Sequence, residues 1–544
     1  MQHGPVRVLS LTALLVFTCA DHGLAQTRAP AKRGDAHKSS TELPTSCLLQ
    51  KHPSEQITAL LETVRDHPTA GAYNTLGALY ARDSRVACAI SAFQAALRLD
   101  SENWQSHYNL GLAFVTKGDR IRAARELQAA IRYKPDSVAS HFALGTLLQD
   151  EGKLDGAIEE FHAALQIDPK FAFAYLSLGI LYTQQGKDRE AVGFFRQAIQ
   201  SDPKSVPAYV NLGLTLARQG EFSEAEREFR SAIQIDPESA EAYTSLGMLE
   251  AKTGRSAEAV ESFRKVVALH PDSADAHVNL GIALVDQYDR GAGFDEFTKA
   301  ARINPDSAGA HYNLGHFYFE TGKYDEARKE LGAAVRLQPN FAGALYFLAL
   351  TERQDNHVER ATELLQKVVS MQPENADAQY LLGRYLARAG KTTDAIAHWK
   401  LALQADPNQS EALYNLARTL NKVHDSDAQQ YQDRFDTLRK DKQTTDRVGQ
   451  LGNFAIQAAN AQNWPQALEQ MNEAIALCGR CAEAAHLHKN LGLMYCRTGN
   501  LKDGEKELRA ALELNPNDGD AKKTIDALQN LHTANHKDSA TSKN

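Results

Sequence analysis

The sequence predicts an all-α fold, a right-handed α-solenoid (superhelix) of about 13 helix–turn–helix repeats. Three columns of residues recur every 34 positions and support this prediction. The first column holds small residues, each preceded by a leucine: Gly77, Gly111, Gly145, Gly179, Gly213, Gly247, Gly281, Gly315, Ala349, Gly383 and Ala417. Twelve positions later comes a column of alanines, interrupted once by Gly293: Ala89, Ala123, Ala157, Ala191, Ala225, Ala259, Ala327, Ala361 and Ala395. The third column follows the first by 24 positions: Pro135, Pro169, Pro203, Pro237, Pro271, Pro305, Pro339, Pro373 and Pro407.

Each column has a steric explanation. Glycine inside a helix costs roughly 0.5–1 kcal/mol relative to alanine, so a recurrent helical glycine indicates a close approach between helices. We expect the alanine column to be the opposing contact on the second helix. Proline cannot continue a helix interior, so the proline column marks the end of each helix pair. Large side chains 16 positions after the small residue are expected to fill the space between repeats: Phe93, Leu127, Phe161, Phe195, Phe229, Phe263, Phe297, Leu331, Leu365 and Trp399.

This pattern resembles the tetratricopeptide repeat, a 34-residue helix–turn–helix unit. Residues 138–171 show it well, with these matching positions: Leu144, Gly145, Gly152, Ala157, Phe161, Ala164 and Pro169. We predict eleven in-register repeats over residues 70–443 and two further repeats over residues 444–518. An N-terminal helix is expected within residues 46–69, and a C-terminal capping helix over residues 519–532, because a solenoid must close its apolar end.

The N-terminus is typical of a secretory signal peptide, residues 1–25. Arg7 precedes a short apolar stretch, and Ala25 ends a small-residue cleavage site. Residues 26–45 are predicted to be a flexible linker and residues 533–544 a disordered tail. We therefore expect an exported protein, periplasmic or envelope-associated, with secretion as the second choice. The residues before Cys19 fit a lipobox poorly, so no lipid anchor is expected there, and no later segment is apolar enough for an integral membrane span.

Composition argues against several classes of function. Lys and Arg number 60 against 68 Asp and Glu, a net charge of −8, whereas nucleic-acid binders usually carry a basic surplus. Gly390-Lys391-Thr392 imitates a phosphate-binding loop, but Tyr385 stands where that loop requires glycine. The repeats leave no stretch long enough for a catalytic domain. We therefore predict that the protein is not an enzyme and uses no cofactor.

The resemblance implies that the first helix of each repeat lines a concave groove, which in this family binds extended peptides or helices of partner proteins. The groove positions then lie three and two residues before the small-residue column, and one and five residues after it. Asparagine recurs two residues before that column: Asn109, Asn211, Asn279, Asn313 and Asn415. A side-chain amide both donates to and accepts from a peptide backbone. The alternative is that asparagine is simply common at this position.

Toward the C-terminal end the groove positions become aromatic and cationic. The aromatic residues are Tyr312, Tyr346, Tyr380 and Tyr414, and the cationic residues are Arg384, Arg388, Arg418 and Lys422. Four cations beside four phenol rings suit an acidic peptide, a C-terminal carboxylate or an anionic glycan. The alternative is a solvated helix face with ordinary charges.

Five cysteines remain after loss of the signal peptide: Cys47, Cys88, Cys478, Cys481 and Cys496. Three interpretations of Cys478 and Cys481 stay open. They form a disulfide, they are free thiols or pair with Cys496, or they bind zinc together with His486 and His488. Cys47 and Cys88 could pair if the N-terminal helix docks on the first repeat.

A column four residues before the small residues alternates between tyrosine and histidine. Its histidines are His107, His141, His277 and His311. A column that histidine shares with tyrosine is best explained by packing, so we predict a structural role for these histidines.

Taken together, the sequence favours a non-catalytic protein–protein interaction scaffold that binds a partner segment in its concave groove. The setting would be exported or periplasmic, within an envelope assembly. The alternative is a carbohydrate- or peptidoglycan-binding solenoid that uses the Tyr/Arg stretch of repeats 8–11.

Overall fold

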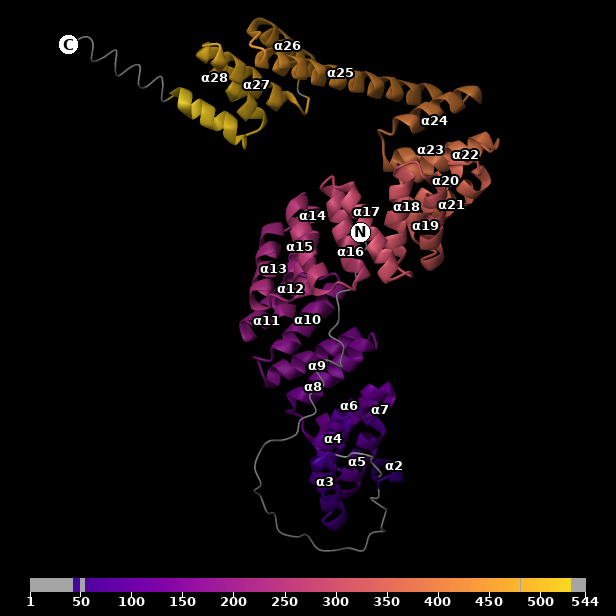
Figure 1. The fold of residues 1–544 in the computed structure, drawn as a ribbon, viewed down its shortest axis with the longest axis vertical. Coiled ribbons are helices and arrows are strands. Elements are labelled where there is room, and N and C mark those ends of the chain that lie inside the picture. Colours follow the sequence, from indigo (N-terminus) through magenta and orange to yellow (C-terminus); the bar gives the residue numbers. More distant parts are fainter. Residues whose placement is uncertain (1–42, 49–53, 480, 530–544) are drawn as a thin grey trace, which may run out of the picture. The chain divides into compact units, whose positions relative to one another are not determined.

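The computed structural model describes residues 43–48, 54–479 and 481–529, and every regular element in these ranges is a helix (Figure 1). The predicted signal peptide, most of the linker and the C-terminal tail lie outside the described residues. The chain divides into two compact bodies, residues 1–310 and residues 311–544. None of the described helices is both long enough and apolar enough to cross a membrane.

The first body holds seven helix pairs, preceded by α2 (Thr45–Leu48) and α3 (Glu55–Asp66). The first helices of the pairs are α4 (Ala70–Arg82), α6 (Trp104–Lys117), α8 (Val138–Asp150), α10 (Ala172–Gln184), α12 (Val206–Gln219), α14 (Ala240–Lys252) and α16 (Ala274–Asp286). The second helices are α5 (Val86–Leu99), α7 (Arg120–Tyr133), α9 (Leu154–Ile167), α11 (Asp188–Ser201), α13 (Phe222–Ile235), α15 (Ser256–Leu269) and α17 (Arg290–Ile303). Each first helix packs on its own second helix and on that of the preceding repeat, which is the nearest-neighbour pattern of a solenoid.

The second body continues the pattern from α18 (Ala308–Glu320), which begins just before the boundary. Its further helices are α19 (Tyr324–Leu337), α20 (Ala342–Gln354), α21 (Val358–Met371), α22 (Ala376–Arg388), α23 (Thr392–Ala405), α24 (Ser410–Lys422), α25 (Ala428–Asn460), α26 (Trp464–Cys478), α27 (Ala484–Arg497) and α28 (Leu501–Leu514). Residues 519–529 are also helical, and Ala521, Ile525 and Leu528 bury one face of this segment beside Leu508. That segment therefore covers the last helix pair.

The small-residue column is explained by the large side chain 16 positions later in the same repeat. A Cβ placed on Gly77 would lie 2.5 Å from a ring carbon of Phe93, and Phe93 is fully buried. Gly111 stands in the same relation to Leu127, and Gly383 to Trp399. The close contact is therefore made by this large residue rather than chiefly by the alanine column, which corrects the expectation from the sequence.

The turn between the two helices of a repeat requires a left-handed backbone. Gly118 has a φ of 82° and Gly220 a φ of 86°. In the repeats that lack this glycine, the residue at the same position also has a positive φ: Ser84, Tyr288, Asn356 and His424. The turn geometry is thus conserved through the repeats even where the residue is not.

One junction differs from the predicted boundary between residues 443 and 444. Helix α25 runs through it without a break, so it supplies both the second helix of repeat eleven and the first helix of repeat twelve (Figure 1). The position that carries proline in the preceding repeats is Asp441, and residues 439–447 contain neither glycine nor proline. Nothing in the sequence therefore stops the helix at that point.

Candidate functional site

The first helices lie on the inner side of each stack. Consecutive first helices such as α4 and α6, α12 and α14, or α22 and α24 pack against each other. Within the described residues, no two consecutive second helices pack to a comparable extent. Because neighbours are closer on the inside of a curve than on the outside, the first helices form the concave side. We call the four predicted groove positions of each repeat the inner columns.

Two of the predicted asparagines are buried. Asn109 is 0% exposed, and its Nδ2 donates a 3.0 Å hydrogen bond to Oδ1 of Asn74 on the neighbouring first helix. Asn211 is 7% exposed, and its Nδ2 donates to the carbonyl oxygen of Pro207 at 2.8 Å. The expectation that these two residues face a bound peptide is therefore wrong, because packing between first helices covers them.

The other three asparagines are half-buried. Nδ2 of Asn415 donates to the carbonyl oxygen of Glu411 at 2.8 Å, a contact within its own helix. Asn279 makes no hydrogen bond with any described residue, and Asn313 lies at the equivalent place on α18. Within the first body, where Asn109 and Asn211 are buried, the structure therefore shows no continuous ladder of exposed asparagines.

The four tyrosines all lie in the second body. Tyr312 packs against Phe341 and Phe347, with ring centroids 4.7 and 6.2 Å away, and burial raises the pKa of its phenol. Burial, together with Asp377 and Tyr385, raises the pKa of Tyr346 to about 12. These two phenols therefore stay protonated at neutral pH and can donate hydrogen bonds.

Tyr380 and Tyr414 lie next to the cationic residues. The guanidinium of Arg384 lies over the ring of Tyr380, 5.7 Å from its centroid, and 5.5 Å from that of Tyr385. Tyr414 is 44% exposed and packs one side of its ring against Phe435. The structure thus places an arginine against the ring faces in α22 and leaves the next ring, in α24, open to solvent.

The four cations form no ion pair with any carboxylate of the described residues. Nε of Arg384 is buried and makes no hydrogen bond with a described residue. Arg388, Arg418 and Lys422 are exposed, and none of the three forms an ion pair within the described part of the chain. Positive charge therefore accumulates on the inner columns of α22 and α24 without internal neutralisation.

Two cysteine pairs are bonded in the structure. Cys47 is joined to Cys88, which ties α2 to α5, and Cys478 is joined to Cys481 at the end of α26. Cys496 is a free, partly buried thiol. The zinc interpretation does not fit, because both cysteines of its ligand set are in a disulfide and Nδ1 of His488 lies 2.6 Å from Glu507.

Each histidine of the column contacts a glutamate of the same chain that the sequence analysis did not identify. Nδ1 of His107 contacts Glu126 at 2.7 Å, and Nδ1 of His141 contacts Glu160 at 2.6 Å. His277, His311 and His488 make the same contact. In every case the glutamate follows the histidine by 19 positions, so this spacing was the signal in the sequence.

Comparison with known proteins agrees with the helix pairs. The tetratricopeptide-repeat family matches residues 75–120, 108–172, 346–410 and 453–519. The cilia and flagella-associated protein 70 C-terminal domain, also a tetratricopeptide-repeat family, matches residues 149–344. No curated protein matches the sequence.

Several solved structures are similar to segments of the chain. MamA protein is 25% identical over 31% of this chain and 93% of its own, with a TM-score of 0.29. YrrB, described as a TPR protein with an unusual peptide-binding site, is 24% identical over 34% of this chain and 95% of its own, with a TM-score of 0.28. Pseudomonas aeruginosa PilF is 21% identical over 39% of this chain and 96% of its own, with a TM-score of 0.35. Scores this low carry no argument about function. The family matches and the spacing of the helix pairs show that the chain belongs to the tetratricopeptide-repeat family and has an α-solenoid fold.

Proposed function

We propose that the protein is a non-catalytic scaffold that binds a segment of a partner protein along the inner columns of its second body. Tetratricopeptide repeats generally act as protein-interaction scaffolds. Each repeat adds one first helix to a continuous surface, which suits an extended or helical segment better than a small molecule.

The observation that carries this proposal is the uncompensated charge on α22 and α24. Arg384, Arg388, Arg418 and Lys422 occupy matching inner columns of two consecutive repeats and have no partner carboxylate among the described residues. An acidic segment would supply the missing charges, and arginine can hold a carboxylate with two parallel hydrogen bonds. The exposed ring of Tyr414 offers an apolar face beside them.

The exported setting is supported by the two disulfides. Cys47–Cys88 and Cys478–Cys481 would persist in the periplasm or outside the cell, whereas the cytosol keeps most thiols reduced. This agrees with the N-terminal segment predicted to be a signal peptide. We therefore place the scaffold in an envelope assembly.

The test is crosslinking of the native protein in its own cells, followed by mass spectrometry of the crosslinked peptides. We expect crosslinks to an acidic segment of one envelope protein. A synthetic peptide of that segment should then bind the purified protein more weakly as salt concentration rises. Replacing Arg384, Arg388, Arg418 and Lys422 together by alanine should weaken binding by at least roughly tenfold at low salt and flatten the salt dependence.

The matched control removes four cations of the same body that lie outside the inner columns. Lys367, Lys391, Lys440 and Lys442 are exposed and form no ion pair with a described residue, so their replacement by alanine makes the same change in net charge. Equal weakening by both quadruple variants would contradict the proposal. Binding of a purified anionic glycan in place of any peptide would instead favour the carbohydrate-binding alternative.

A further inference from the structure

A buried carboxylate occupies a column that is otherwise apolar. Three residues after the small-residue column, nine of the eleven in-register repeats carry a large apolar or aromatic residue: Tyr80, Phe114, Leu148, Tyr182, Leu216, Leu284, Tyr318, Leu386 and Leu420. The exceptions are Glu250 and Glu352. Glu352 is paired, because its Oε2 lies 2.8 Å from Nδ1 of His357 and 3.5 Å from Nε of Arg328. Glu250 is 2% exposed and has no such close cation. A glutamate this deeply buried, with no cation within hydrogen-bonding distance of its carboxylate, is rare in proteins.

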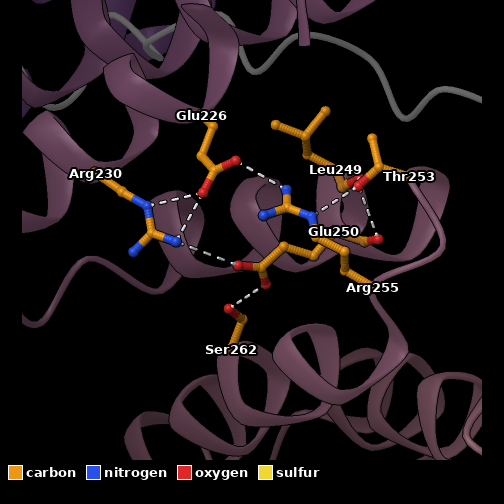
Figure 2. A network of polar contacts seen from close by, with 7 residues as sticks. All are labelled: Glu226, Arg230, Leu249, Glu250, Thr253, Arg255 and Ser262. Atoms are coloured by element: carbon orange, nitrogen blue, oxygen red, sulfur yellow. Dashed lines mark hydrogen bonds and ion pairs between the residues drawn. The ribbon is translucent and has the colours of Figure 1, made fainter. Parts of the chain in front are cut away.

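The arginines around Glu250 are held by a different carboxylate (Figure 2). Oε1 of Glu226 accepts hydrogen bonds from Arg230 at 2.7 and 3.0 Å, and Oε2 of Glu226 accepts one from Arg255 at 2.9 Å. The closest guanidinium nitrogen to Oε1 of Glu250 belongs to Arg230 and is 3.9 Å away, which is beyond hydrogen-bonding distance. Oε2 of Glu250 accepts a 2.7 Å hydrogen bond from the hydroxyl of Ser262. One carboxylate oxygen therefore has no hydrogen-bond donor among the described residues.

Glu250 belongs to the lining of a pocket. A cavity of about 510 Å³ lies between α13, α14 and α15, and Glu250, Glu258, Glu261 and Arg230 contribute to its lining. Glu261 is bonded to Arg264, whereas Glu258 is exposed and forms no ion pair with a described residue. The lining thus carries three carboxylates against one guanidinium, and that guanidinium is already held by Glu226.

The pocket arises from an exchange of residue types between two columns. In the preceding and following repeats, the position equivalent to Ser262 is Glu228 or Glu296, and the position equivalent to Glu250 is leucine. In this repeat the acid stands on the first helix and a small hydroxyl residue on the second. The exchange places the carboxylate on α14 instead of α15. On α15 a serine replaces the larger glutamate, which leaves space beside Glu250.

We propose that this pocket binds the guanidinium group of an arginine side chain presented by a partner protein. Glu250 would accept from it at the floor of the pocket, Glu258 would accept at the rim, and the half-buried ring of Tyr243 would lie beside the cation. The planar fork of a guanidinium can reach two carboxylates at once, which a compact ammonium cannot do with the same geometry. The site lies outside the inner columns and in the first body, so it is independent of the proposed function.

The test uses Nα-acetyl-arginine amide as the probe and saturation-transfer NMR on the full chain as the readout. We expect saturable binding to the wild-type protein and none of the neutral isostere Nα-acetyl-citrulline amide. Glu250→Gln should weaken arginine-amide binding at least roughly tenfold, which corresponds to about 1.4 kcal/mol. Glu258→Gln should also weaken binding, and because this side chain is exposed the variant keeps the fold intact.

The matched control is Glu241→Gln, an exposed position at the start of α14 that carries the same charge change outside the pocket. It should bind the probe as the wild type does. Equal weakening in Glu241→Gln would show general electrostatic attraction and would overturn the proposal. Binding of the citrulline probe, or no saturable signal with the arginine probe up to about 50 mM, would also overturn it.

Discussion

The imidazole of His107 is held between two acceptors, with Nδ1 2.7 Å from a carboxylate oxygen of Glu126 and Nε2 3.1 Å from the carbonyl oxygen of Ser101. A neutral imidazole has a single N–H, so both contacts are hydrogen bonds only when the ring is protonated. Burial lowers the pKa of His107, but the hydrogen bonds to Glu126 and to the Ser101 carbonyl outweigh that effect and raise the pKa above its ordinary value.

The first prediction concerns the pH dependence of the second repeat. Because the folded-state pKa of His107 is raised, its stabilisation is complete below the unfolded-state pKa and is lost as pH rises through the folded-state pKa. We expect hydrogen exchange in α6 and α7, corrected for intrinsic rates, to become faster between about pH 6 and pH 8, with a loss of about 1 kcal/mol in opening free energy. His107→Gln should flatten this dependence. Glutamine is a suitable replacement, because its amide does not titrate and its Nε2 can still donate to the Ser101 carbonyl, as Nε2 of Gln379 donates to the Pro373 carbonyl.

The second prediction compares two neighbouring glutamates whose pKa values are shifted in opposite directions. Burial raises the pKa of Glu250, whereas hydrogen bonds from Arg255 and Arg230 lower the pKa of Glu226. The charge of Glu250 therefore lowers stability as pH rises through its pKa, and the charge of Glu226 adds stability that is lost on acidification. At pH 7, Glu250→Gln should raise the unfolding free energy by about 1 kcal/mol and Glu226→Gln should lower it. Both differences should shrink toward about pH 4, and thermal unfolding at both pH values would measure them.

The third prediction uses two glycines of the same helix. A Cβ on Gly77 would overlap the buried ring of Phe93, whereas a Cβ on Gly71 meets nothing within 4 Å. Gly77→Ala should destabilise the first repeat by about 1–3 kcal/mol, because the ring cannot move without disturbing the core. Gly71→Ala should stabilise it by up to about 1 kcal/mol through helix propensity. Denaturant unfolding of both variants measures these changes in unfolding free energy. A Gly77→Ala protein as stable as the wild type would show that the ring of Phe93 has room to move.

The fourth prediction concerns the five cysteines that remain if the predicted signal peptide is removed. Thiol titration of the native protein should detect one thiol, that of Cys496, and Cys496→Ser should remove it. The reaction should be slow, because burial raises the pKa of the Cys496 thiol and lowers its thiolate fraction. Loss of the Cys47–Cys88 bond in Cys88→Ala should cost up to about 4 kcal/mol, given the length of the loop that it closes. Two or more reactive thiols before reduction would contradict this pairing.

Much of the fold could be predicted from the sequence, because each repeat contacts only its neighbours. The glycine that faces Phe93, the turn at Gly118 and the proline that ends a helix pair are local steric requirements, and they recur every 34 residues. The continuous helix α25 follows from the same logic, since its junction lacks a helix breaker. The repeat boundary predicted between residues 443 and 444 instead lies inside this helix.

Less of the candidate site could be predicted, because exposure depends on the neighbouring repeat. Asn109 occupies a groove column, yet it is buried because Asn74 offers an amide partner on the adjacent helix. Arg388 occupies an inner column as well and stays exposed. The pocket at Glu250 depends on two substitutions that lie on different helices, Glu250 itself and Ser262. Because each column of the repeat was considered separately, the pairing of Glu250 with Ser262 across two helices could not be predicted.

The last prediction follows from the continuity of α25. In repeat twelve the small residue is Ala455, four positions beyond the 34-residue register, and Phe454 precedes it where the preceding repeats carry leucine. Leu382, at the same place in repeat ten, is 0% exposed, but Phe454 is 47% exposed. In repeat ten, the second helix of the preceding repeat, α21, packs against the first helix α22, which carries Leu382. At repeat twelve, that second helix and the first helix carrying Phe454 are parts of the single helix α25, so the one does not fold back over the other.

Leu382→Ala should therefore cost about 2–5 kcal/mol, the usual range for a buried leucine, whereas Phe454→Ala should cost well below that range. Differential scanning calorimetry of the two variants compares them in the same protein. The second body has to unfold at a lower temperature in Leu382→Ala and at nearly the wild-type temperature in Phe454→Ala. An equally large loss for both residues would mean that another part of the protein, or a second chain, covers Phe454 in solution, and a dependence of that loss on protein concentration would identify the second chain as the cover.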